Sequence, residues 1–322
     1  MIQPPTSLEI IERNIKRAIV EQLQRIGIHC HVFSRIKDYD SLTEKVTRKK
    51  ERNGGLPYYS PGGKMVQDII GIRIVTYFYE DVQFLWDLFK NMYLVDNIEC
   101  EEITPDTFKA LRKNMVCRMP DNERRVLLEF KNHLETNDIY NLVDDTFEIQ
   151  FRTTLSEGWH EVDHVLRYKL EKDWQGYDDE NRMLNGIYAT LETSDRALKS
   201  LFDELAYKSY HDGNWMAMLR FKFRLNTPAG GTLSEDNIRI LNENSNLAKK
   251  VLRCSRSMFL RAICFSGIRI PMSLDNILGT VNYLFIGDET LSKVTSPLLL
   301  RDLNATMKSY QKLTNEYKVK EC

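Results

Sequence analysis

A serine hydroxyl lies close in the chain to four positive charges between residues 35 and 48. They are Arg35, Lys37, Ser41, Lys45 and Arg48. Lys45 and Arg48 are three residues apart, so they share one face of a predicted helix. Lysine offers phosphate a point charge and arginine a two-pronged donor, so this group could surround a polyphosphate. A solvated basic helix face is the alternative, because runs of charge are commonly just that.

A carboxylate and an arginine accompany the next apolar run. Asp68 precedes residues 69–79, which are rich in β-branched and aromatic side chains, and Arg73 lies inside that run. An arginine within a buried strand needs a partner or a ligand. A carboxylate where a strand begins is a frequent metal ligand and equally a frequent turn residue, so Asp68 alone leaves both interpretations open.

A second carboxylate lies in the segment TFEIQFRT, residues 146–153. Strand alternation places its three apolar side chains on one face and Glu148, Gln150 and Arg152 on the other. A half-exposed antiparallel strand would show the same pattern. Together, however, Asp68 and Glu148 would supply two carboxylates from separate strands. Such a pair could hold a Mg²⁺ ion that bridges phosphates, beside the basic helix.

A competing constellation lies in WHEVDHVLRYK, residues 159–169. His160, Glu161 and His164 match H-E-x-x-H, in which two imidazoles four residues apart bind zinc in metallopeptidases. Glu192 could provide a third ligand. A pattern with three fixed positions arises often by chance, so a zinc peptidase is an alternative of another class.

Hydrophobic periodicity indicates the elements that position these residues. After Trp174 the strand signal fades and the charge shifts: residues 171–212 hold ten acidic and five basic residues, and residues 215–270 hold ten basic and three acidic. We therefore expect two domains, 1–175 and 176–322. The pattern predicts strands at 67–79, 124–130 and 143–152, and helices at 10–26, 39–52, 81–93, 156–170, 180–210 and most of 232–310.

Composition excludes several classes of protein. The 45 basic and 46 acidic residues give a net charge of −1, so the total neither indicates nor excludes a nucleic-acid partner. No apolar run approaches the roughly 18 residues that span a bilayer. The six cysteines form no C-x-x-C pair. These features predict a cytoplasmic protein with reduced thiols and no membrane partner.

Taken in order, the four blocks resemble the synthetase domain of the RelA/SpoT family, the alarmone synthetases. The blocks are RIKDYDSLTEK, DIIGIR, FEIQFRT and WHEVDHVLRYK, and they extend from Arg35 to Lys169. In the family's last block an acidic residue precedes the histidine, as Asp163 precedes His164 here. This resemblance explains the His160–His164 pattern without zinc.

The resemblance implies an α+β fold, a nucleotidyltransferase-like mixed sheet flanked by helices, followed here by a mainly helical C-terminal region. It implies Mg²⁺-dependent transfer of pyrophosphate from ATP to the 3′-hydroxyl of a nucleotide, by default GDP or GTP to give (p)ppGpp. It also implies roles for individual residues. Arg35 and Arg73 would contact adenine, and the phosphates would be bound by Lys37, Ser41, Lys45 and Arg48. Mg²⁺ would be held by Asp68 and Glu148, with Glu148 helping to deprotonate the hydroxyl, and the acceptor side would be lined by Gln150, Arg152, His164 and Lys169.

The acceptor half departs from the family pattern. The family carries a Gly-Tyr-x-Ser segment whose tyrosine stacks on guanine, but no glycine lies between Gly71 and Gly158, and Tyr140 lacks that context. An RNA or tRNA 3′ end, as in toxic members, or another nucleotide is therefore an alternative acceptor. The 34 residues before Arg35 are too few for the family's hydrolase domain, so we expect a synthetase-only protein.

Three further expectations concern the class of function, the C-terminal region and the assembly of the protein. A nucleotide-binding regulator without catalysis is a third class of function, which two retained carboxylates disfavour. The segment with Lys249, Lys250, Arg253, Arg256 and Arg261 is either an amphipathic packing helix or an RNA-binding surface. A homo-oligomer is compatible with the sequence.

Overall fold

The computed structural model describes residues 5–100, 113–228 and 231–306. Contacts divide the chain into two compact units, residues 1–21 with 30–196 and residues 22–29 with 197–322. Helices α1 (Thr6–Ile26) and α6 (Asp178–His211) contribute to both units. Sequence analysis places the boundary at 175/176, ahead of α6. The contacts place it inside α6, because the first half of that helix packs on the sheet-containing unit.

The first unit is built on a five-stranded mixed sheet in the order β1-β2-β5-β4-β3. β2 and β5 are parallel, and the other neighbours are antiparallel. This arrangement confirms the predicted α+β fold with a mixed sheet. The strands are β1 (Cys30–Ile36), β2 (Ile70–Thr76), β3 (Val95–Cys100), β4 (Lys113–Arg118) and β5 (Thr146–Thr153).

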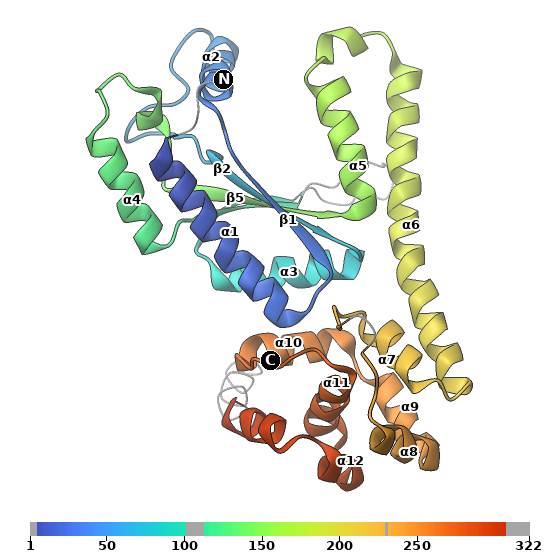
Figure 1. Cartoon of the computed structure of the whole chain (residues 1–322). Coiled ribbons are helices and arrows are strands. Elements are labelled where there is room, and N and C mark those ends of the chain that lie inside the picture. The colour runs from blue at the N-terminus through green and yellow to red at the C-terminus, as the bar shows by residue number, and fades with distance from the viewer. Residues whose placement is uncertain (1–4, 101–112, 229–230, 307–322) are drawn as a thin grey trace, which may run out of the picture. The chain divides into compact units, whose positions relative to one another are not determined.

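The two faces of β5 carry different residues, as the alternation predicts. Phe147, Ile149 and Phe151 are fully buried on one face. Phe151 packs edge-on against Trp86 of α3 (Tyr79–Met92), with ring centroids 5.7 Å apart. The opposite face is polar and is covered in part by α5 (Thr154–Asp163), which lies across the sheet from α3 (Figure 1). The apolar core thus lies on the α3 side, and the polar side chains collect under α5.

Residues 121–132 correct one prediction. Sequence analysis assigns a strand to 124–130, but the segment forms helix α4 (Asp121–Asn132). Its first turn carries Asp121 and Glu123, which favour a helix N-terminus, and Arg, Leu and Glu are good helix formers. Only Leu127 is buried within it, so there is no apolar strand face.

The second unit is helical where it is described, which confirms the predicted mainly helical C-terminal region. None of the described helices is long and apolar enough to cross a membrane. Besides the second half of α6, the unit contains α7 (Trp215–Phe223), α8 (Glu235–Glu243), α9 (Ser245–Arg253), α10 (Arg256–Ser266), α11 (Leu274–Val281) and α12 (Glu289–Val294), and residues 297–306 are also helical.

Candidate active site

Strand register brings the predicted site residues into rows on the polar face of the sheet. Arg35 of β1 lies opposite Gly71 of β2, which in turn lies opposite Glu148 of β5. In the next row, Arg73 lies opposite Gln150. Because Gly71 has no side chain, the Arg35 Cγ lies 3.7 Å from where a Cβ on Gly71 would be. The Arg35 side chain therefore lies directly over Gly71 of the DIIGIR block, at ordinary contact distance.

Asp68 is the centre of a charge cluster at the beginning of β2. Its carboxylate forms ion pairs with Lys37, which follows β1, and with Lys45 of α2 (Tyr39–Arg52), whose Nζ lies 2.7 Å from Oδ1. The exposed fraction of the side chain is 13% for Lys37, 24% for Lys45 and 27% for Asp68. The short connection between β1 and α2 and the residues that lead into β2 lie side by side. They thus bring two predicted phosphate ligands, Lys37 and Lys45, to the predicted metal ligand Asp68.

The cluster fixes the ionisation of the Asp68 carboxyl. Burial favours its neutral form, but Lys37 and Lys45 outweigh burial and hold its pKa below the ordinary value. Burial likewise disfavours charged Lys45, but Asp68 raises the pKa of that lysine. Asp68 is therefore an anion, the form in which a carboxylate binds a metal ion.

Glu148 is the second carboxylate of the site. Its pKa is raised, chiefly by burial; a hydrogen bond from Gln150 opposes the rise, and the negative charge of Asp68 adds to it. Gln150 Nε2 donates to Glu148 Oε2 at 2.7 Å. A carboxylate with a raised pKa is a stronger base than an ordinary glutamate, which suits removal of a proton from a hydroxyl.

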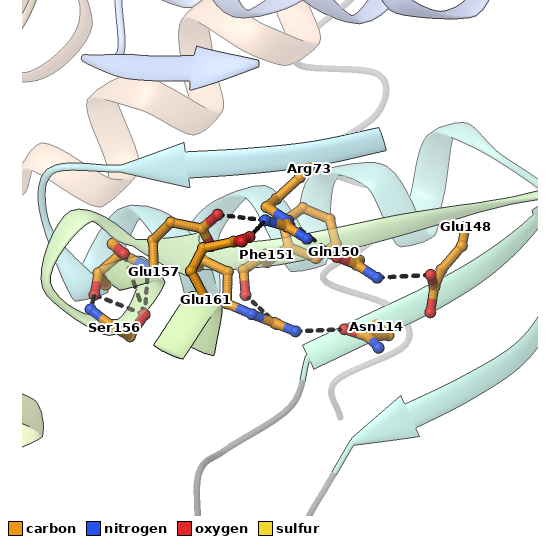
Figure 2. A network of polar contacts seen from close by, with 10 residues as sticks. Arg73, Asn114, Glu148, Gln150, Phe151, Ser156, Glu157 and Glu161 are labelled. Carbon is orange, nitrogen blue, oxygen red and sulfur yellow. Dashed lines mark hydrogen bonds and ion pairs between the residues drawn. The ribbon is translucent and has the colours of Figure 1, made fainter. Parts of the chain in front are cut away.

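Arg73 of β2 connects the sheet to α5. Its Nε donates to Gln150 Oε1 at 3.1 Å, and its Nη1 binds Glu157 at 2.5 Å and also Glu161 (Figure 2). Sequence analysis gives Glu157 no role and reads Glu161 as part of a zinc motif. The sequence signal that could have identified this pair is that Glu157 and Glu161 lie four residues apart in a helix that follows a strand. This spacing places both carboxylates on one face of the helix.

Arg152 is the most enclosed of the predicted acceptor-side residues. It is 8% exposed, and its Nη2 donates to Asn114 Oδ1 of β4 at 3.2 Å. Burial lowers its pKa to about 10, so it still carries its charge at neutral pH. Sequence analysis does not identify Asn114, because β4 is not among the predicted strands and Asn114 lies 38 residues from Arg152 in sequence.

The remaining predicted residues lie on α2 and in the turn that follows α5. Ser41 is exposed on α2, where its hydroxyl and amide both donate to the N-cap residue Asp38, at 2.9 and 2.7 Å. Arg48 is one turn beyond Lys45. His164 opens a π-helical turn, His164–Tyr168, with Lys169 next to it. Burial lowers the pKa of His164, and the positive charges of Lys169 and Arg35 lower it further.

The H-E-x-x-H residues face different partners. The His160 ring packs against Trp159 and Tyr188, Glu161 pairs with Arg73, and Glu192 pairs with Arg196. Within residues 5–100, 113–228 and 231–306, no group of three or more His, Cys, Asp or Glu is placed to hold a metal ion. Among those residues the zinc alternative lacks a third ligand. Mg²⁺ needs less from the protein, because it commonly uses one or two carboxylates together with substrate phosphates.

Comparison with known proteins identifies the segment that carries the site. Residues 34–173 match the family described as "Region found in RelA / SpoT proteins". The match confirms the resemblance drawn from the four sequence blocks and supports a pyrophosphokinase. No curated protein matches the chain.

Several solved structures resemble the chain. They include small alarmone synthetase 1 from Bacillus subtilis, with 19% identity over 60% of this chain and 92% of that one and a TM-score of 0.42. Small alarmone synthetase 2 from Bacillus subtilis has 20% identity, with coverages of 61% and 96% and a TM-score of 0.43. A GTP pyrophosphokinase family protein from Streptococcus pneumoniae has 19% identity, with coverages of 62% and 90% and a TM-score of 0.41.

Proposed function

Residues 34–173 form a RelA/SpoT region, and on that premise we propose that the protein transfers the β,γ-pyrophosphate of ATP to the 3′-hydroxyl of a nucleotide. The bond from the β-phosphorus to the oxygen that bridges it to the α-phosphorus breaks, which releases AMP. A new bond joins the acceptor O3′ to the β-phosphorus, and the hydroxyl loses its proton. One observation carries the proposal: the Asp68 carboxylate, just before β2, pairs with Lys37 and Lys45, and Glu148 lies on β5, the parallel neighbour of β2.

The charged residues divide between the donor's phosphates and its base. Lys37, Lys45 and Arg48 bind the phosphates and offset the charge that develops on the transferred group. Ser41 adds a hydroxyl at the same end. Arg35 and Arg73 hold the adenine between them. Positioning and charge compensation provide most of the rate enhancement in such a reaction, because the transferred group is highly anionic.

The two carboxylates suit a magnesium site. Asp68 is held ionised, and Glu148 lies close enough for its pKa to respond to that charge. These residues would hold Mg²⁺, which would neutralise phosphate charge. Glu148 also accepts the proton of the attacking hydroxyl, for which its raised pKa is favourable.

The default acceptor is GDP or GTP, which gives a (p)ppGpp-type product. Gln150, Arg152, His164 and Lys169 lie on the acceptor side of this arrangement. The sequence lacks the family's Gly-Tyr-x-Ser segment between Gly71 and Gly158, and this keeps an RNA or tRNA 3′ end as the second candidate acceptor.

A product assay tests the proposal directly. The purified protein is incubated with ATP, Mg²⁺ and, separately, GDP, GTP, ATP alone and tRNA, and the products are resolved by mass. We expect AMP together with one acceptor that has gained a pyrophosphate.

Glu148→Gln should abolish turnover and leave ATP binding nearly unchanged, because removal of the base typically costs about 10²–10⁴-fold. Near-wild-type transfer by this variant would refute the mechanism, and ATP binding without any product would favour an inactive nucleotide-binding regulator. Stoichiometric zinc bound through His160 and His164 would favour the peptidase.

A further inference from the structure

Arg73 is held along its edges by three side chains. A guanidinium donates hydrogen bonds only in its own plane. Nε points to Gln150, and Nη1 points to both Glu157 and Glu161 (Figure 2). The Arg73 side chain is nevertheless 25% exposed. The in-plane donors on these two nitrogens are therefore engaged within the protein, while part of the side chain remains open to solvent.

Such a geometry restricts what Arg73 can bind. Bidentate recognition of phosphate requires free donors along one edge of the guanidinium. Stacking on a flat aromatic ring requires only its face. The two carboxylates beside Arg73 also offset its positive charge, which weakens its attraction for a polyphosphate.

We propose that Glu157 and Glu161 are positioning residues that set which way the donor nucleotide binds. They commit Arg73 to stacking on a planar base and exclude phosphate from that end of the site. This inference rests on the proposed function for the identity of the donor and adds two residues to it.

The distribution of charge along the site reinforces this orientation, because carboxylates offset the arginine at one end and lysines are in excess at the other. Lys37 and Lys45 surround Asp68 at the beginning of β2. Glu157 and Glu161 lie one turn apart on α5, which covers Arg73. A nucleoside triphosphate has an anionic end and a neutral base, so its favoured orientation places the phosphates at the lysines and the base at Arg73.

Helix α5 is fixed in place, which lets its carboxylates hold Arg73 where it lies on β2. Thr153 is the N-cap and forms a capping box with Ser156. The Thr153 hydroxyl also donates to Asp195 Oδ2 of α6 at 2.5 Å. The capping box and the bond to α6 anchor the first turn of α5, and Glu157 lies in that turn.

The test separates recognition of the base from recognition of the phosphates. Glu157→Gln, Glu161→Gln and the double variant are compared with wild type for direct binding of ATP and of inorganic tripolyphosphate by calorimetry. We expect the double variant to bind ATP about tenfold more weakly and tripolyphosphate as tightly or more tightly, because only the base end is disturbed. Where turnover is measurable, the loss should appear in KM for ATP, with kcat changed less than about twofold.

Two further variants control this experiment. Glu204→Gln removes an exposed carboxylate that pairs with Lys208 on α6, and it should change neither affinity. Arg73→Lys keeps the charge but removes the planar face, so it should reproduce the selective loss of ATP binding. Equal weakening of both ligands, or unchanged ATP binding in the double variant with an unaltered Tm, would overturn the inference. Failure of the proposed function would look different: the binding contrast would persist although no acceptor gained a pyrophosphate.

Discussion

Lys45 and Asp68 form an ion pair in which Nζ lies 2.7 Å from Oδ1, although 23 residues separate them in the chain. The other oxygen of the same carboxylate binds Lys37. Two predicted phosphate ligands are thus held by a predicted metal ligand, and the two lysines share this one counter-charge in the nucleotide-free protein. When ATP and Mg²⁺ bind, the phosphates would replace Asp68 as the partners of the lysines, and Mg²⁺ would replace the lysines as the partner of Asp68.

The first prediction concerns this balance. Asp68→Asn should abolish pyrophosphate transfer and also lower the free energy of unfolding by about 2 kcal/mol, because two partly buried lysines lose their counter-charge. Adding Lys45→Met should restore part of the stability without restoring activity, since one of the uncompensated charges is removed. Thermal unfolding and the product assay on the single and double variants measure the two effects. A double variant less stable than Asp68→Asn would contradict this account.

The second prediction concerns Asp195, which is 3% exposed and accepts the hydrogen bond from Thr153. Burial raises its pKa from 3.8 to about 6. Between these values the folded protein retains a proton that the unfolded chain has released, so this group makes stability fall as pH rises from about 4 to 6. Asp195→Asn should therefore stabilise the protein by about 3 kcal/mol at pH 7.5 and by little at pH 4.

Asp203→Asn provides a control of opposite sign. Lys199 and Arg224 pair with Asp203, and they hold its pKa below the ordinary value against the effect of burial. Its replacement should lower Tm at pH 7.5 and have less effect as the pH falls below 4, where the carboxylate becomes protonated in wild type. Tm values for both variants from about pH 3 to pH 8 check the pair of predictions. Equal shifts at every pH for Asp195→Asn would show that burial of its charge is not the cause.

The third prediction concerns two glycines in helices. A Cβ on Gly279 of α11 would lie 2.8 Å from Thr295 Cγ2 and 3.2 Å from Leu299 Cδ2. Gly279→Ala should therefore destabilise its unit by about 1–3 kcal/mol through overpacking. Gly186 of α6 is exposed, and no atom lies within 4 Å of the position that a Cβ would take there, so Gly186→Ala should stabilise by about 0.5–1 kcal/mol. Tm shifts of the same sign for the two variants would contradict this account of the packing.

Features that depend on near neighbours follow from the sequence without the fold. Helix α2 has the predicted bounds, residues 39–52, because its pattern of charged and apolar residues and its Asp38 cap are local. The alternation in 146–153 predicts the two faces of β5, because successive side chains in a strand point to opposite sides. The order of the four blocks likewise indicates the RelA/SpoT region.

Which distant residues meet depends instead on the assembled fold. The strand predicted at 124–130 is a helix, and strands β1, β3 and β4 are absent from the sequence prediction. Short segments do not distinguish a strand from a helix or a loop without their neighbours. Glu157 and Glu161 lie 84 and 88 residues from Arg73, and Asp195 lies 42 residues from Thr153. No local pattern encodes these pairs, because they arise from the parallel register of β2 with β5 and from the way α5 returns over the polar face of the sheet.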